Sequence, residues 1–82
     1  MTAENSRSGQ SMAISDPAML GAVIRGTRRS HGLTQSQLAG LAGTGLRFVS
    51  ELERGKPNVA LDKVLAVLAV LGLRLQAVEA GS

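Results

Sequence analysis

The stretch LTQSQLAGLAGTGLRFVSELERGK contains more helix start and stop signals than one long helix can accommodate. Thr34, followed three residues later by Gln37, is the pattern of a capping box, in which each side chain bonds a backbone N–H group near the other. Gly43 and Gly55 can both adopt the left-handed backbone that ends a helix. The pattern therefore predicts two short helices joined by a tight turn, over about residues 35–42 and 45–54.

A longer helix is predicted before this pair. Asp16 suits the N-cap position because its side chain can accept a backbone N–H, and Pro17 suits the first helical position. Gly32 then provides a left-handed end. The apolar positions between them recur at helical spacing, and the face that we expect to be buried consists of Leu20, Val23, Ile24 and the methyl group of Thr27.

The last predicted helix, over about residues 61–71, has apolar side chains almost all around it. A core-facing stripe needs only about a third of the circumference, so the remaining apolar surface is exposed unless another chain covers it. After Gly72, apolar and polar residues alternate over residues 73–78, which predicts a strand. A lone strand needs a partner, and the simplest partner is its own copy across a two-fold axis; the alternative is an extended tail. The residues expected at this homodimer interface are Val67, Leu71, Leu73, Leu75 and Ala77.

Length and composition limit the remaining possibilities. With 82 residues the chain has room for one domain, which we expect over residues 15–72, and a domain this small is marginally stable. It contains no cysteine, so disulfides cannot stabilise it, and Phe48 is its only aromatic residue. The net charge is +3, but residues 25–58 contain six basic and two acidic residues, a local balance of 6 − 2 = +4. A basic segment that coincides with a helical pair indicates an anionic partner.

The two ends of the chain are predicted to lie outside the folded domain. Residues 1–14 are polar and without periodicity, so we expect a disordered tail, and residues 73–82 form the predicted dimerisation strand and tail. The N-terminal segment has no apolar stretch of signal-peptide length. The most apolar run, VLAVLAVL, is far shorter than the ~20 residues that cross a bilayer. We therefore expect a soluble protein of the cytoplasm that does not enter membranes.

The spacing within the helical pair matches a helix-turn-helix, in which the first helix crosses the DNA backbone and the second enters the major groove. A small residue, Ala39, stands where the helices must touch, and Gly43 stands four residues later in the turn. Val49 and Leu52 follow at the positions that fix the second helix to the core. Leu38, Leu41 and Ala42 complete the expected buried face of the first helix, and Thr44 can cap the second.

These residues resemble the Cro/C1-type (XRE) helix-turn-helix family over about residues 20–71, through RGTRRSHGLTQSQLAGLAGTG and RFVSELERGKPN. The second segment, with the Leu-rich helix and LRLQAVE after it, is closest to the HipB-like antitoxins of that family. The resemblance implies an all-α, lambda-repressor-like DNA-binding domain of four to five helices, with the C-terminal strand pairing across a homodimer. It also implies a palindromic double-stranded operator as partner and a HipA-like kinase toxin as a candidate second partner.

The resemblance further assigns roles to single residues. Gln35 corresponds to a phosphate-binding glutamine, and Arg47, Ser50 and Glu51 correspond to base-reading positions, where an arginine can bind guanine and a glutamate can accept from cytosine. Arg28 and Glu53 correspond to a structural ion pair rather than to DNA contacts. The full set of residues expected to contact DNA is Arg25, Arg29, Gln35, Thr44, Gly45, Leu46, Arg47, Ser50, Glu51, Arg54, Lys56 and Asn58.

Enzymatic and metal-dependent functions find no support in the sequence. His31 is the only histidine, cysteine is absent, and no acidic cluster or phosphate-binding loop is present, so we expect neither a metal site nor a cofactor. The predicted function is that of a sequence-specific repressor, the antitoxin of a HipBA-like toxin–antitoxin pair that represses its own operon. Two alternatives remain: an XRE-type regulator without a toxin, and a protein-interaction module that does not bind DNA.

Overall fold

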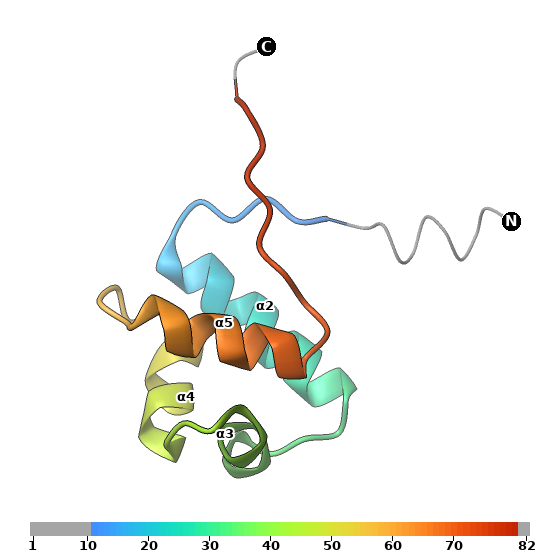
Figure 1. Ribbon diagram of the computed structural model, residues 1–82, viewed down its shortest axis with the longest axis vertical. Coiled ribbons are helices and arrows are strands. Elements are labelled where there is room, and N and C mark those ends of the chain that lie inside the picture. The colour runs from blue at the N-terminus through green and yellow to red at the C-terminus, as the bar shows by residue number, and fades with distance from the viewer. Residues whose placement is uncertain (1–10, 81–82) are drawn as a thin grey trace, which may run out of the picture.

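A computed structural model describes residues 11–80 of the chain. Within that range the fold is all-α, as predicted, and the predicted C-terminal strand is not formed (Figure 1). α3 and α4 lie at one end of the domain, and residues 73–80 extend from the opposite side. The helices are α2 (Pro17–Ser30), α3 (Gln35–Ala42), α4 (Leu46–Glu53) and α5 (Leu61–Val70).

The helix ends lie close to the predicted signals. Asp16 caps α2, with its carboxylate accepting the backbone N–H of Met19 at 2.8 Å. The capping box of α3 is complete, because Thr34 Oγ1 accepts from the Gln37 backbone N–H at 3.0 Å and Gln37 Oε1 accepts from the Thr34 backbone N–H at 2.9 Å. Gly43 has a φ of +73°, the left-handed conformation that turns the chain from α3 into α4.

One aliphatic core holds the four helices together. α3 packs against both α4 and α5, and α2 packs against α4. Every helix contributes at least one buried side chain, so no pair of helices forms a core alone. The buried apolar residues are Ile24, Leu38, Ala39, Val49, Leu52, Val64, Val67, Leu68 and Leu71. None of the helices in residues 11–80 has the length and apolarity that a bilayer crossing requires.

The structure corrects two predictions about the helical pair. Leu41, expected in the core, is 64% exposed, because the buried stripe of α3 runs through Leu38 and Ala39 and Leu41 lies outside it. Thr44 does not cap α4. Gly45 occupies the N-cap position without a side-chain bond, and the buried Thr44 hydroxyl has no hydrogen-bond partner.

The predicted dimer surface also needs correction. Val67 and Leu71 are 0% and 3% exposed, since they face the core of their own domain and are therefore closed to a second chain. The outer face of α5 instead presents Leu61 and Leu65, one helical turn apart. Residues 73–78, which were predicted to form a strand, form no regular secondary structure in the single chain. Residues 11–14 of the predicted tail form none either. The rest of that tail lies outside the described residues.

α2 and α4 approach each other closely at Gly21. A Cβ atom at this position would lie 2.6 Å from the carbonyl oxygens of both Leu52 and Glu53, which is shorter than any normal contact. Gly26, on the same helix, has no neighbour from residues 11–80 within 4 Å of the equivalent Cβ position. Gly21 is therefore needed to seat α2 on the last turn of α4, whereas Gly26 is not.

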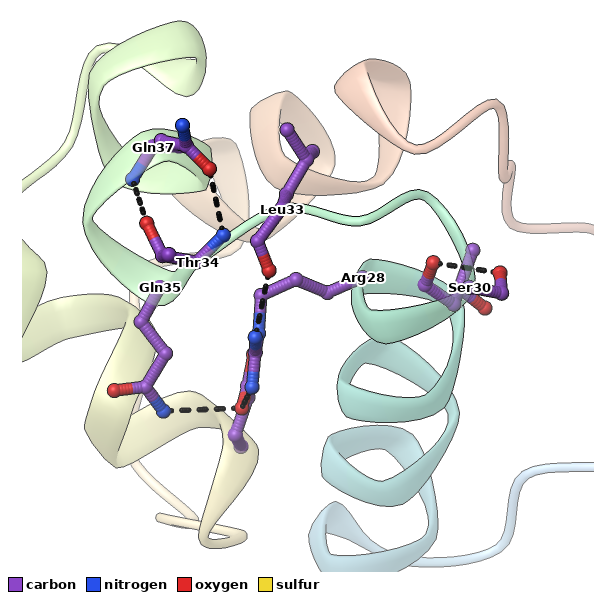
Figure 2. Close-up of polar contacts among 8 residues, drawn as sticks. Arg28, Ser30, Leu33, Thr34, Gln35 and Gln37 are labelled. Atoms are coloured by element: carbon purple, nitrogen blue, oxygen red, sulfur yellow. Dashed lines mark hydrogen bonds and ion pairs between the residues drawn. The ribbon is translucent and has the colours of Figure 1, made fainter.

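A buried ion pair fixes the same two helices. Arg28 Nε lies 2.6 Å from Glu53 Oε2, and Arg28 Nη2 donates to Glu53 Oε1 at 3.0 Å, which makes a bidentate pair. Arg28 Nη1 also donates to the carbonyl of Leu33 at 2.8 Å, and Gln35 Nε2 donates to Glu53 Oε1 at 3.0 Å (Figure 2). The pair that the family resemblance implied thus joins α2, the α2–α3 connection, α3 and α4.

Opposing effects act on the pKa of Glu53. Burial, the largest of them, raises that pKa, but hydrogen bonds from Arg28 and Gln35 together with the positive charges of Arg28 and Arg25 outweigh burial and leave the pKa below its usual value. The hydrogen bond to Glu53 in turn raises the pKa of Arg28. Both groups are therefore charged at neutral pH.

We predict opposite effects of alanine at the two α2 glycines. Gly21→Ala forces the helices apart and should lower the free energy of unfolding by about 1–3 kcal/mol, the usual cost of overpacking. Gly26→Ala should raise it by up to about 1 kcal/mol, because alanine favours the helix and meets no neighbour. Urea unfolding followed by circular dichroism measures both, and equal stability of the two variants would contradict the packing described.

We predict that Glu53→Leu alone costs about 3–5 kcal/mol of stability, because it leaves the Arg28 guanidinium buried without its partner. The double variant R28M/E53L should recover most of that loss, since no buried charge remains. Chemical denaturation near neutral pH compares the three proteins. A double variant no more stable than Glu53→Leu would show that the pair contributes more than the avoidance of an unpaired charge.

The ion pair also predicts a pH dependence. A carboxyl group whose pKa is lower in the folded than in the unfolded chain adds stability that is complete above the unfolded pKa, about 4.3, and lost as pH falls through the folded value. The stability difference between the wild type and R28M/E53L should therefore shift in favour of the double variant as pH falls below about 4. A difference that stays constant with pH would exclude this linkage.

Candidate nucleic-acid interface

The outward face of α4 carries the residues predicted to read bases. The turn before it is closed by a hydrogen bond from the Thr44 backbone N–H to the Ala39 carbonyl at 2.9 Å, which fixes the angle between α3 and α4. Arg47 projects furthest, with 90% of its side chain exposed. Leu46 is exposed as well, and Ser50 is half-buried. A polar, outward-facing helix of this kind is the element that enters a major groove.

A basic groove of about 750 Å³ runs between α2, the start of α3 and the inner side of α4. Its charged lining residues are Arg25, Arg28, Arg29, Arg54 and Glu53, so its formal charge is 4 − 1 = +3. Arg28 and Glu53 neutralise each other, so the net positive charge of the groove comes from the exposed Arg25, Arg29 and Arg54. A groove with this charge favours phosphate groups.

The N-terminus of α3 opens into the same groove. The first N–H groups of a helix lack intrahelical partners and carry the positive end of the helix dipole, so they favour an anion. Gln35 and Ser36 line the groove at this point. Ser36 was not among the residues predicted to contact DNA. Its position as the second residue of α3 could have suggested it, because the backbone N–H there has no intrahelical partner. Gln35 uses one amide hydrogen on Glu53, which leaves the second for a phosphate.

A second charged group lies on the outer side of α4. Glu51 accepts from Arg47 Nε at 3.2 Å and from Lys56 Nζ at 3.1 Å. Hydrogen bonds from Lys56 and then Arg47 are the main reasons that the pKa of Glu51 lies below its usual value. Residues predicted to read bases and a residue predicted to bind phosphate are therefore already paired with each other in the free protein.

The predicted DNA-contact residues thus fall into separate groups. Arg25, Arg29, Gln35, Ser50 and Arg54 line the basic groove, and Arg47, Glu51 and Lys56 form the charged group beside it. Gly45, Leu46 and Asn58 are exposed without a polar side-chain contact to residues 11–80, and the hydroxyl of Thr44 is buried.

Phe48 and His31 serve the fold rather than this surface. Phe48 packs half-buried against the core, with Lys63 Nζ 5.7 Å from its ring centre. His31 ends α2, and its Nε2 lies 3.2 Å from the Leu71 carbonyl oxygen, which links the ends of α2 and α5.

The chain is similar to known helix-turn-helix proteins. A family model described as helix-turn-helix matches residues 24–78. Over 68 residues the chain is 46% identical to an uncharacterized HTH-type transcriptional regulator, y4mF, of Sinorhizobium fredii (strain NBRC 101917 / NGR234), and the match covers 83% of this chain and 90% of the relative.

Solved structures of two further proteins have the same fold. A HipB variant in complex with an O2 20mer has a TM-score of 0.79 and 25% identity over 88% of this chain and 100% of its own. HipB in a HipA–HipB–O2–O3 complex has a TM-score of 0.78 at 25% identity over 87% of this chain and 100% of its own. The restriction-modification controller protein C.AhdI of Aeromonas hydrophila has a TM-score of 0.66 and 34% identity, over 72% of this chain and 86% of its own.

The family match spans more than half of the chain and includes α3, α4 and the turn between them. The chain therefore belongs to the XRE-type helix-turn-helix family and is a DNA-binding transcriptional regulator.

Proposed function

We propose that the protein is a homodimeric repressor that binds a palindromic operator and blocks transcription by occupying promoter DNA. The observation that carries the proposal is the placement of the exposed Arg47 on α4 directly beside a groove with a formal charge of +3. A helix that presents base-reading side chains next to phosphate-binding charges fits a major groove and its flanking backbone. The function is therefore one of binding rather than catalysis, exerted on DNA in the cytoplasm, at the nucleoid.

Contacts to the DNA backbone would come from two sides of α4. Arg25, Arg29 and Arg54, with Gln35 and the α3 N-terminus, would bind phosphates in the basic groove. Lys56 and Asn58, in the loop after α4, would bind phosphates on the other side. These contacts set affinity and register without reading sequence.

Contacts to bases would come from the outward face of α4. Arg47 would bind guanine O6 and N7, Leu46 would contact a thymine methyl, and Ser50 would serve a base or a phosphate. Glu51 is a candidate acceptor for cytosine N4. Gly45 offers its backbone alone, and Thr44 would contribute through its backbone because its hydroxyl is buried.

Dimerisation would use exposed apolar side chains away from α4. Leu61 and Leu65 on α5 are exposed, and so are Leu75 and Ala77 of the C-terminal segment, while Leu73 packs against the core. Pairing of residues 73–78 with their copy would satisfy their backbone groups as an antiparallel ribbon. Two α4 helices could then face half-sites about 34 Å, or ~10 base pairs, apart.

The similarity to HipB, including HipB in complex with HipA, supports an antitoxin role in which a HipA-like kinase is the second partner. The similarity to a controller protein and to y4mF supports the alternative of a regulator without a toxin. A kinase-like reading frame beside the gene favours the first and its absence favours the second. A non-binding interaction module would give no mobility shift with its own promoter at ~50 mM salt, where electrostatic binding is strong.

We predict different effects of two substitutions on DNA binding. Arg47→Ala should lower affinity for an operator selected from random DNA by about 1–3 kcal/mol and relax preference at one base pair. Lys56→Ala should weaken binding to selected and to scrambled duplexes equally. For the wild type we expect log affinity to fall against log salt concentration with a slope of about −5 to −7, and the variant should make this slope shallower by about 0.9 per protomer. Arg74→Ala removes a positive charge from the C-terminal segment and serves as the control, with sedimentation velocity used to verify that it forms the same dimer as the wild type. Wild-type affinity in both α4-side variants would refute this docking mode.

We predict that Leu65→Glu or Leu75→Glu converts the dimer to a monomer. Each leucine buried between copies contributes about 1.5–3 kcal/mol, and a buried glutamate adds a desolvation cost. Leu41→Glu is the matched control, because Leu41 is an exposed leucine on α3, outside the proposed interface. Sedimentation velocity reports the mass of each protein. A monomeric wild type, or variants that stay dimeric, would contradict this interface.

A further inference from the structure

Glu51 holds two cations of the DNA-facing surface at once. Its Oε2 lies 3.2 Å from Arg47 Nε, and its Oε1 lies 3.1 Å from Lys56 Nζ, so both carboxylate oxygens are occupied. The side chain of Glu51 is only 22% exposed, whereas those of Arg47 and Lys56 are 90% and 47% exposed. The carboxylate therefore lies close against α4, while both cations can still be reached by a ligand.

The backbone around Lys56 holds this arrangement in place. The Lys56 backbone N–H donates to the Glu51 carbonyl at 3.1 Å, so Lys56 is bonded to Glu51 through its main chain and its side chain. Gly55, with a φ of +87°, makes the turn between them, and a Cβ atom there would lie 2.9 Å from the Ala18 Cα. The turn is thus packed against the start of α2, and it returns Lys56 to Glu51.

This trio matters more for charge than for folding. Ion pairs between exposed side chains add little stability. Glu51 nevertheless lowers the formal charge of the trio from +2 to +1, on the side of α4 that faces DNA. Non-specific DNA binding is almost entirely electrostatic, so it becomes weaker when a carboxylate partly neutralises the two cations. An operator, in contrast, can replace the carboxylate with contacts from its own bases and phosphates.

We propose that Glu51 is a specificity-determining residue that restrains Arg47 and Lys56 in the free protein and so suppresses binding to non-operator DNA. The inference rests on the proposed function, because it concerns the same surface. It differs from a base-reading role for Glu51, in which the carboxylate strengthens operator binding and leaves non-operator binding unchanged. On the operator, Arg47 leaves Glu51 for a guanine; on other sequences it gains no such partner, and the ion pair competes with the phosphates.

The test compares wild type with Glu51→Gln, which keeps the shape of the side chain and removes its charge. We expect affinity for a scrambled duplex to rise about five- to tenfold per protomer at ~0.1 M salt, with the salt slope steeper by about 0.9 per protomer. Operator affinity should rise less, so the ratio of operator to scrambled affinity falls. Glu79→Gln removes the same charge from the C-terminal segment, on the side away from α4, and should leave that ratio unchanged.

A second comparison separates restraint of the cations from simple repulsion of DNA by Glu51. In an Arg47→Gln/Lys56→Gln background there is no cation to restrain, so Glu51→Gln should no longer steepen the salt slope. An equal steepening in that background would overturn the proposal. So would unchanged scrambled-duplex binding by Glu51→Gln alone, and so would a loss confined to the operator, which would make Glu51 a base reader.

These outcomes are distinct from failure of the proposed function. If the wild type selects no sequence from random DNA, the repressor role itself fails. If it selects an operator and Glu51→Gln keeps the wild-type preference for it, only the inference about Glu51 fails. Thermal unfolding of Glu51→Gln should match the wild type closely, because Arg47 and Lys56 are exposed and remain solvated without the carboxylate.

Discussion

A single carboxylate near the end of α4 connects three of the four helices of this domain. Glu53 receives Arg28 from α2 and Gln35 from α3, and Arg28 also holds the carbonyl of Leu33 between those helices. A buried charge is costly unless it is paired and hydrogen-bonded, so arrangements that separate Glu53 from these partners are disfavoured. The angle between α3 and α4, on which any docking to DNA depends, is thereby tied to the packing of α2.

Two glutamates two residues apart on α4 have different tasks. Glu53 is buried, and its partners come from other helices, so its charge helps to orient α2 and α3 relative to α4. Glu51 lies on the outer side, and its partners are the exposed Arg47 and Lys56, so its charge acts on the surface that we propose binds DNA. Helical geometry produces this division, because residues two apart on a helix point in different directions.

Most of the fold was predictable from the sequence, since its helix boundaries are set by local signals. The capping box at Thr34 and the left-handed Gly43 act within a few residues of themselves, and both are present. Predictions of which side chains on a helix face the core were less successful. Leu41 was expected in the core and Val67 on the surface, and both were wrong, because on helices this apolar the pattern does not identify the face that packs.

The contacts within the candidate site could not be predicted from the sequence. The resemblance assigned Gln35 to phosphate and Glu51 to a base, and the free protein pairs them with Glu53 and with Arg47 and Lys56 instead. The partner of Gln35 is 18 residues away along the chain, a separation that no local pattern encodes. Knowledge of the helix angles is needed to find such bonds, and these angles depend on the whole core.

The length of α3 and α4 has a consequence for control of the protein in the cell. Each has eight residues, fewer than the ~12–15 below which an isolated helix is marginal in water. Neither can keep its shape as a detached peptide, so the DNA-facing surface exists only while the entire small domain is folded. A protease that cleaves the transiently open chain would therefore remove all DNA binding from that molecule. The strength of regulation would then depend on how many molecules remain folded and intact.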